Sequence, residues 1–224
     1  MENITVEALF ELRNDFIAPL FGGIKYPFEV LDNIGNYIKE TGSRLPAEIF
    51  ERIGENIWAA RSAKIAPTAS ITGPCIIGEN TEVRHCAFIR GNALIGNNCV
   101  VGNSTELKNA VLIGKVQVPH YNYVGDSVLG YGSHMGAGSI TSNVKSDKSL
   151  VKIKCGGEIL ETGRKKLGAM LGDFAEIGCG SVLNPGTVIG KNSNVYPLSS
   201  VRGVIPPDSI YKNAGEVAKK RNEY

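Results

Sequence analysis

The chain has 224 residues, of which 42% are hydrophobic and 21% charged, and its formal net charge is +2. Its lysines and arginines are mostly dispersed, which argues against a nucleic-acid-binding protein. No stretch approaches the roughly 18 apolar residues of a membrane span, and the N-terminal residues lack the basic and apolar regions of a signal peptide. The five cysteines contain no Cys-x-x-Cys pair, as in proteins of a reducing compartment. We therefore expect a cytoplasmic protein that binds neither nucleic acid nor membrane.

Residues 1–60 have the apolar spacing of short helices. A first stripe ends at Pro19, a second begins at Pro27, and a third starts near Pro46 and ends at Gly54. We expect this segment to cover the exposed first coil of the solenoid described next, or to mediate a contact. A helical arm that binds a partner protein is the alternative.

From residue 65 onward an aliphatic residue recurs at every sixth position. The first run contains Ile65, Ile71, Ile77, Val83, Ile89, Ile95, Val101, Leu107 and Ile113, and the second Leu171, Ile177, Leu183, Ile189, Val195 and Val201. The fourth position after twelve of these fifteen residues is occupied by alanine, cysteine, serine or threonine, which are all small. Two residue classes with one period of six are typical of a parallel β-helix, whose short strands bury both classes. The sequence therefore predicts an all-β solenoid over residues 61–206, followed by a C-terminal tail at 207–224.

The six-residue period is lost between Asn143 and Leu167. Within this insertion of residues 144–167, Leu150–Lys154 and Glu158–Leu160 flank a Gly-Gly pair, which predicts a β-hairpin with a two-residue turn. Insertions into solenoids lie on one face and are often functional, so we expect this one to contribute to a site.

Residues separated by three hexapeptides are expected to stack, because three hexapeptides make one triangular coil and neighbouring strands lie roughly 4.8 Å apart. Arg90, Lys108 and Asp126 have this spacing. Two stacked cations predict an anion site, since a phosphate bridging a guanidinium and an ammonium offsets their repulsion. The alternative is a pair of solvated surface charges.

His120 follows Pro119 at an irregularity of the period, which places it at a corner of the coil. Glu106 precedes it in the sequence by a little less than one coil. A carboxylate bonded to one ring nitrogen fixes the tautomer and leaves the other nitrogen free as a general base. The alternative is an ordinary surface histidine.

Two segments carry a resemblance to a known family: His120–Asp126, and Gly136–Asn143 with the sequence Gly-Ala-Gly-Ser-Ile-Thr-Ser-Asn. They resemble the acetyltransferase half of the bifunctional enzymes that make UDP-N-acetylglucosamine from glucosamine-1-phosphate. The likeness runs from about Arg90 to Val201. The stretches at 164–169 and 184–186 look most like archaeal-type members and their sugar-1-phosphate nucleotidylyltransferase relatives. The resemblance implies a left-handed coil and a homotrimer with coenzyme bound between subunits.

Carried over residue by residue, the resemblance implies a complete acyl-transfer site. His120 is the general base, Glu106 orients it, and the Ala137 amide faces the thioester oxygen. The residues implied for substrate binding are Arg90 and Lys108 for the phosphate and Tyr123 and Asn143 for the sugar. His134 stands where the family has asparagine, and Lys148 lies one residue before the position of a phosphate-facing lysine. Cys179 and Pro197 replace small residues near the coenzyme.

The expected function is thus an acetyl-CoA-dependent N-acetyltransferase acting on an amino-sugar phosphate, with glucosamine-1-phosphate as the expected acceptor. Residues 1–60 are too short for a nucleotidylyltransferase domain and lack its glycine-rich phosphate loop, so we expect none. The alternative is a non-catalytic β-helix module that partners a separate nucleotidylyltransferase.

A third hypothesis concerns metal, because hexapeptide proteins also include carbonic anhydrases whose three metal-binding histidines are shared between subunits. The histidines here, His85, His120 and His134, are far apart in the sequence and lack that family's closely spaced pair. We therefore expect no metal requirement.

Overall fold

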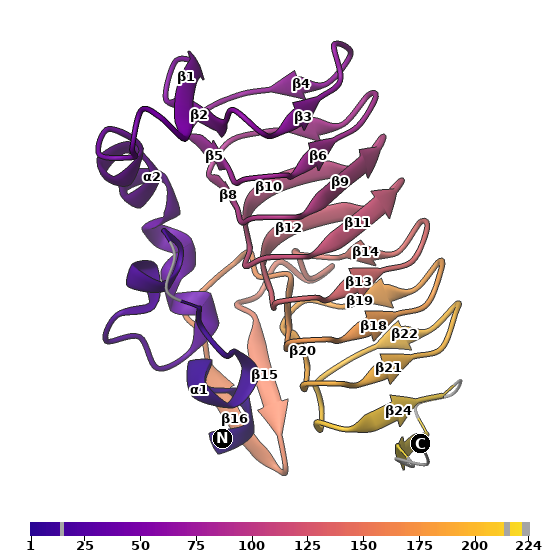
Figure 1. Ribbon diagram of the computed structural model, residues 1–224. Helices are drawn as coiled ribbons and strands as arrows, with labels where there is room; N and C mark the ends of the chain where they lie inside the picture. The colour runs from indigo at the N-terminus through magenta and orange to yellow at the C-terminus, as the bar shows by residue number, and fades with distance from the viewer. Residues whose placement is uncertain (14–15, 213–215, 221–224) are drawn as a thin grey trace.

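The computed structural model describes residues 1–13, 16–212 and 216–220. The chain folds as a left-handed parallel β-helix, with stacked triangular coils and a helical segment along one side (Figure 1). The parallel β-helix was predicted from the period, and its left hand from the family resemblance. The N-terminus lies at the level of the last coils, and the helical segment runs from there back towards the first coil.

The helical segment consists of short elements. They are η1 (Glu2–Ile4), α1 (Val6–Leu9), η2 (Ala18–Phe21), η3 (Pro27–Asp32) and α2 (Ile34–Gly42). Helix α1 is a single turn capped by the Thr5 hydroxyl and ended by the extended residue Phe10. The helix expected after Pro27 is present as η3 followed by α2. No helix in the described part of the chain is both long and apolar enough to cross a membrane.

The prediction of a helix between Pro46 and Gly54 is wrong. Strand β1 (Phe50–Gly54) pairs antiparallel with β2 (Ile57–Ala60), and Ile57 of β2 lies opposite Cys75 of the next coil. Phe50 is buried, whereas Ile53 is 45% exposed, so the apolar residues do not line one helical face. The solenoid therefore begins at Ile57, within the segment expected to precede it.

Three faces make up the solenoid. The first face contains β3 (Lys64–Ile65), β6 (Glu82–Val83), β9 (Val100–Asn103), β11 (Gln117–His120), β13 (His134–Met135), β18 (Glu176–Ile177), β21 (Asn194–Val195) and β24 (Ser209–Tyr211). The second contains β4 (Ser70–Ile71), β7 (Phe88–Ile89), the first halves of β10 (Glu106–Leu112) and β12 (Tyr123–Leu129), then β14 (Ile140–Thr141), β19 (Val182–Leu183) and β22 (Ser200–Val201). The third contains β2, β5 (Cys75–Ile77), β8 (Ala93–Ile95), the second halves of β10 and β12, then β17 (Ala169–Leu171), β20 (Thr187–Ile189) and β23 (Val204–Ile205). In the expected tail, β24 adds one more strand to the first face and pairs antiparallel with β25 (Val217–Lys219).

Some coils are shorter than three full hexapeptides. Ile95 lies opposite Leu112, so Leu112 and not Ile113 fills the interior. Ile113 is instead buried on the outer side of the solenoid, with the N-terminal segment. The same shortening places Leu107 opposite Val124, and the next coil, from Leu112 to Leu129, is also one residue short. These shorter coils change which residues stack near the candidate site.

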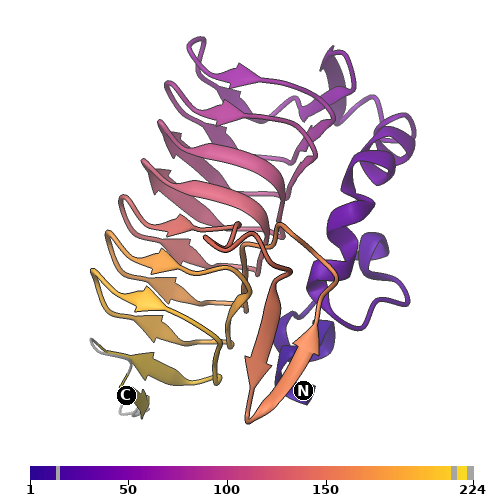
Figure 2. The same cartoon turned by 180° about the vertical axis from the view of Figure 1, so that it is seen from behind.

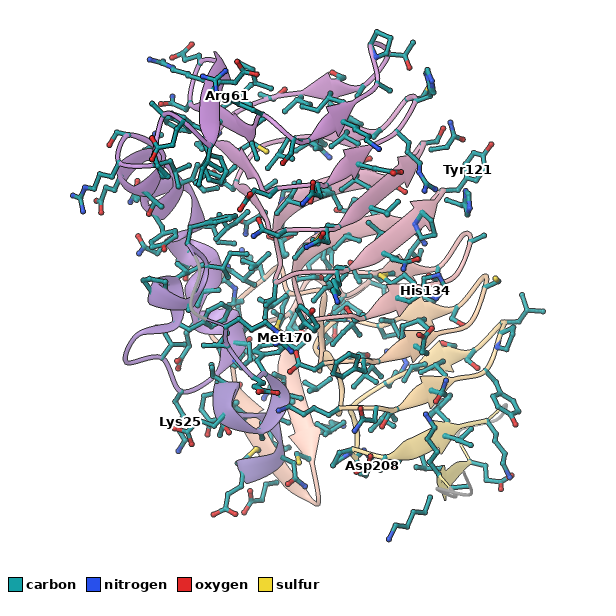
Figure 3. All side chains as sticks on the ribbon, in the orientation of Figure 1. Lys25, Arg61, Tyr121, His134, Met170 and Asp208 are labelled. Carbon is teal, nitrogen blue, oxygen red and sulfur yellow. The ribbon has the colours of Figure 1, made fainter. Side chains whose placement is uncertain are left out.

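The helices of the N-terminal segment cover the third face and not the end of the first coil, contrary to our expectation (Figure 2). Strand β1 of the same segment does pair with the first coil, through β2. The outward residues of this face are apolar and form one buried cluster with the segment; they include Ile76, Leu94, Val111, Val128, Met170 and Val188. Met170 lies between the two parts in Figure 3. Because burial of apolar area stabilises folding, this face is a second core outside the coil.

The insertion forms the predicted hairpin. Strands β15 (Lys152–Cys155) and β16 (Glu158–Glu161) pair antiparallel around Gly156 and Gly157, both with positive φ. Ion pairs join it to the N-terminal segment, between Arg164 and Asp32 at 2.6 Å and between the Met1 amino group and Glu158 at 3.2 Å.

Asp173 fixes the N-terminal segment to the solenoid. Its backbone N–H donates to Leu9 O, and its buried carboxylate accepts from the backbone N–H groups of Glu11 at 2.7 Å and Tyr131 at 2.8 Å. Burial raises the pKa of Asp173 above its ordinary value. The two carboxylate oxygens thus satisfy two backbone donors in different parts of the chain.

We expect Asp173→Asn to lower the free energy of unfolding by about 1–3 kcal/mol, because an amide offers one acceptor oxygen to two N–H donors. Chemical denaturation measures this change. Glu48→Gln, which alters an exposed carboxylate, should change stability by no more than about 0.5 kcal/mol. An unchanged unfolding midpoint in Asp173→Asn would show that this carboxylate is not an anchor.

Candidate active site

The corner that joins the first face to the second brings together four of the predicted residues: His120, Ala137, Cys179 and Pro197. Gly138 N–H donates to His120 O at 3.0 Å, Gly180 N–H to Ala137 O at 2.8 Å, and Leu198 N–H to Cys179 O at 2.9 Å. The predicted base and the predicted coenzyme contacts therefore lie on consecutive coils along one corner.

His120 stands on a rigid turn. Its backbone N–H donates to the Asn122 side chain, and the buried Asn122 amide donates in turn to Gly136 O and Ser139 O. Tyr121, at φ 51°, projects from the outer edge of the corner (Figure 3). The His120 residue is exposed, and within residues 1–13, 16–212 and 216–220 no group is hydrogen-bonded to its imidazole. The backbone is thus fixed while the ring stays accessible.

The predicted pair of stacked cations is present on the second face. Ile89 lies opposite Leu107, which places Arg90 directly over Lys108. Each cation pairs with a carboxylate, Arg90 with Glu106 at 2.6 Å and Lys108 with Asp126 at 3.2 Å. Asp126 does not continue the stack, because Lys108 lies opposite Gly125 in a coil that is one residue short.

A buried carboxylate links the expected sugar contacts to one another. Asp126 is 3% exposed and accepts hydrogen bonds from Asn109 Nδ2 at 2.9 Å and Asn143 Nδ2 at 2.6 Å, besides its ion pair with Lys108. The Asn143 amide also donates to the Tyr123 hydroxyl at 3.1 Å. The sequence points to Asp126 through its spacing from Arg90 and Lys108 and through the segment that carries the resemblance, but neither signal predicts this buried network, and Asn109 carries no signal of its own.

The Tyr123 phenol remains protonated well into the alkaline range. Burial, followed by the negative charges of Asp126 and Glu106, raises the pKa of Tyr123 above its ordinary value. A protonated phenol can donate a hydrogen bond to a ligand oxygen on this face.

The expected hydrogen bond between Glu106 and His120 is absent from this arrangement. The carboxylate of Glu106 is bonded to Arg90, and its backbone N–H donates to Asn122 O. His120 lies opposite Asn103, whereas Glu106 lies opposite Tyr123 on the other side of the corner. The sequence separation between Glu106 and His120 is smaller than the length of this coil, so the two side chains begin on different faces.

Two further expected contacts lie outside the network around Asp126. His134 is on the first face, with Nδ1 2.9 Å from Glu176 on the neighbouring coil. Lys148 is exposed, in a turn closed by its own N–H and Lys145 O. Neither side chain is hydrogen-bonded to Asp126 or Tyr123 among the residues that the structure describes.

The three histidines do not share hydrogen-bond partners among the residues that the structure describes. His85 is bonded to the Thr68 hydroxyl at 2.9 Å, and His134 to Glu176. Over the described residues, no group of three His, Cys, Asp or Glu side chains is placed to hold a metal ion.

Sequence comparisons match parts of this chain to known proteins. A family model described as the GMPPB C-terminal domain matches residues 71–155. A bifunctional sugar-1-phosphate nucleotidylyltransferase/acetyltransferase of Sulfurisphaera tokodaii is 33% identical over 103 residues, which are 46% of this chain and 26% of that protein. The bifunctional protein GlmU of Methanococcus vannielii is 32% identical over 114 residues, which are 50% of this chain and 27% of that protein. The chain thus spans about a quarter of the length of these relatives.

Solved structures with the same kind of fold include acetyltransferases. PerB of Caulobacter crescentus, crystallised with CoA and GDP-perosamine, aligns at a TM-score of 0.38 and 16% identity over 72% of this chain and 56% of that one. The acetyltransferase domain of PglB from Neisseria gonorrhoeae, crystallised with acetyl coenzyme A, aligns at 0.39 and 13% identity over 86% and 76%.

We expect Asp126→Asn to lower the pKa of Tyr123 towards its ordinary value, because the substitution removes one of the negative charges that disfavour the phenolate. The wild-type protein and Asp126→Asn are each titrated by ultraviolet absorbance with and without the Tyr123→Phe substitution. The difference between the two titrations reports the ionisation of the Tyr123 phenol alone. Asp147→Asn changes an exposed carboxylate in the insertion and should leave the titration as it is. An identical Tyr123 titration with Asp and Asn at position 126 would contradict the electrostatic coupling.

Proposed function

We propose that this chain is an acetyl-CoA-dependent N-acetyltransferase whose acceptor is an amino-sugar phosphate, with glucosamine-1-phosphate as the first candidate. The supporting observation is the arrangement of the second face. Its strand Tyr123–Gly125 separates the corner of His120 from Asp126, a path of about 10 Å at roughly 3.3 Å per residue. A sugar lying across this strand would direct its phosphate to the cations and its amine to His120.

Four groups of the chain would carry the reaction. His120 removes a proton from the amine as the nitrogen bonds to the thioester carbonyl carbon. The Ala137 N–H, which is hydrogen-bonded to no other described residue, donates to the carbonyl oxygen as negative charge develops there. The carbon–sulfur bond then breaks, and the proton held by His120 passes to the thiolate. Cys179 and Pro197, on the next coils, would contact the coenzyme.

Arg90 and Lys108 would hold the phosphate. A bound phosphate competes with the carboxylates that occupy these cations, and most readily with Glu106, because the Arg90 and Glu106 side chains are 45% and 32% exposed. Asp126 is buried and held by three donors, so it would stay in place. We propose that Glu106, released from Arg90, turns to His120 and orients its ring.

The family resemblance extends the proposal to assembly and to two remaining residues. We expect a homotrimer, measured by light scattering, in which a second copy completes the coenzyme site. His134 would contact the acceptor from the first face, and Lys148 would contact it from the insertion. The mechanism uses no metal.

We expect His120→Ala to reduce kcat by about 10²–10⁴, the usual contribution of a general base. Mass spectrometry of glucosamine-1-phosphate incubated with acetyl-CoA detects the acetylated sugar. His85→Ala changes an exposed histidine on the same corner, two coils away, and should retain activity. A wild-type protein that acetylates no amino-sugar phosphate would eliminate the proposal.

We expect Glu106→Gln to bind sugar phosphate several-fold more tightly and to turn over more slowly. Binding is tighter because the substitution removes the Glu106 carboxylate, which competes with the phosphate for Arg90. Turnover is slower because His120 loses the residue that positions its ring. Separate KM and kcat values test both effects. Glu82→Gln, which breaks a similar surface pair with Arg84, is the control. An unchanged kcat would remove Glu106 from the mechanism.

The second candidate function is the non-catalytic module that partners a separate nucleotidylyltransferase. The carboxylates that occupy both cations favour it. Calorimetry that shows no binding of acetyl-CoA, together with co-purification of a nucleotidylyltransferase, would support this alternative over the first.

A further inference from the structure

A second cationic site lies between the inserted hairpin and the corner that joins the second face to the third. This basic groove has a volume of about 630 Å³. Its lining consists of Lys145, Lys152, Lys154, Pro185, Arg202, Gly203 and Val204. Figure 1 shows β15 running beside the last coils, where this groove is found. None of its four cations belongs to the Asp126 network or to the corner of His120.

The walls of the groove are held in fixed positions. Lys152 and Lys154 alternate along β15 and share one side of the strand, while Ile153 between them is 1% exposed in the second core. On the opposite wall, Gly186 and Gly203 both have φ of 79°. A Cβ at Gly186 would lie 2.8 Å from Val151 Cγ1, and one at Gly203 would lie 3.4 Å from Lys154 O. The hairpin therefore rests directly against the corner.

The groove carries more positive than negative charge. Lys152 pairs with Glu161 across the hairpin at 2.6 Å, and Lys145 pairs with Asp147 at 3.3 Å. Within the described ranges, no carboxylate lies within ion-pair distance of Lys154 on the hairpin wall or of Arg202 on the opposite wall. Unpaired like charges around a concave surface repel, and a multiply charged anion between them removes that repulsion.

The groove is separate from the cations of the candidate active site, although Arg202 lies on the same stack of residues. The stack runs from Lys108 through Gly125, Ser142 and Asn184 to Arg202. Four coil steps of roughly 4.8 Å separate Lys108 from Arg202 by about 19 Å. One phosphate group cannot contact both ends, so the groove is distinct from the stacked cations of the candidate active site.

We propose that the basic groove binds the diphosphate group of a nucleotide. Cations on two facing walls can each contact a different phosphate, and the volume lies within the range of small-ligand sites and exceeds the needs of a single phosphate ion. Coenzyme A and nucleoside-diphosphate sugars both carry this group. The inference concerns binding alone and does not depend on the proposed acetyl transfer.

The test is isothermal titration calorimetry of the full chain with inorganic pyrophosphate. An Arg90→Gln/Lys108→Gln background removes the first anion site, so that binding reports on the groove. In that background we expect pyrophosphate to bind and Lys154→Gln/Arg202→Gln to weaken it by at least about tenfold. The matched control is Lys64→Gln/Arg84→Gln, two cations on the first face, which should bind as the background does.

Circular dichroism establishes that each variant is folded. No pyrophosphate binding in the background protein, or equal binding after Lys154→Gln/Arg202→Gln, would overturn the site.

Titrations of the same proteins with coenzyme A and with UDP identify the source of the diphosphate. Weaker coenzyme A binding in Lys154→Gln/Arg202→Gln assigns the groove to the coenzyme, and weaker UDP binding assigns it to a nucleotide-linked acceptor. If neither affinity falls, the nucleotide assignment is wrong.

Discussion

Each coil of this solenoid is hydrogen-bonded to the next, and its interior aliphatic residue lies against the equivalent residue of the neighbouring coil, as Val83 does with Val101. This stacking fixes the direction and spacing of every side chain on the three faces. The residues that follow the buried positions point outward, and the backbone alone holds them at intervals of roughly 4.8 Å from one coil to the next. Arg90 and Lys108 can face one another, despite their like charge, because the residues before them are buried.

The length of each coil decides which of these neighbours meet. A sequence period of six predicts the solenoid, the stacked cations and the place of the hairpin, because all three follow from local pattern. It does not predict that Leu112 replaces Ile113 in the interior, or that Glu106 is displaced from His120 and bonded to Arg90. A coil that is shorter by one residue shifts the stacking register of all residues after it. Where two adjacent residues are aliphatic, as Leu112 and Ile113 are, the sequence does not show which one fills the interior.

The position of residues 1–60 could not be predicted for a different reason. Their apolar side chains were recognisable, but the surface that they cover consists of third-face residues lying between the interior positions, such as Leu94 and Val128. A period that is defined by the interior positions gives no role to these apolar residues, so it does not predict that they form a covered surface. The backbone contacts of Asp173 with Leu9 and Glu11 depend on tertiary placement alone. With this face covered, the corner of His120 and the second face are left as the accessible surfaces near the candidate site.

A co-crystal structure with coenzyme A and glucosamine-1-phosphate tests the central claim most directly, namely that the second face holds an amino-sugar phosphate between the stacked cations and His120. The account predicts phosphate oxygens within hydrogen-bonding distance of Arg90 and Lys108, and the sugar amine within hydrogen-bonding distance of the His120 imidazole. Sugar phosphate bound elsewhere, with Arg90 still paired to Glu106 and the second face empty, would contradict it.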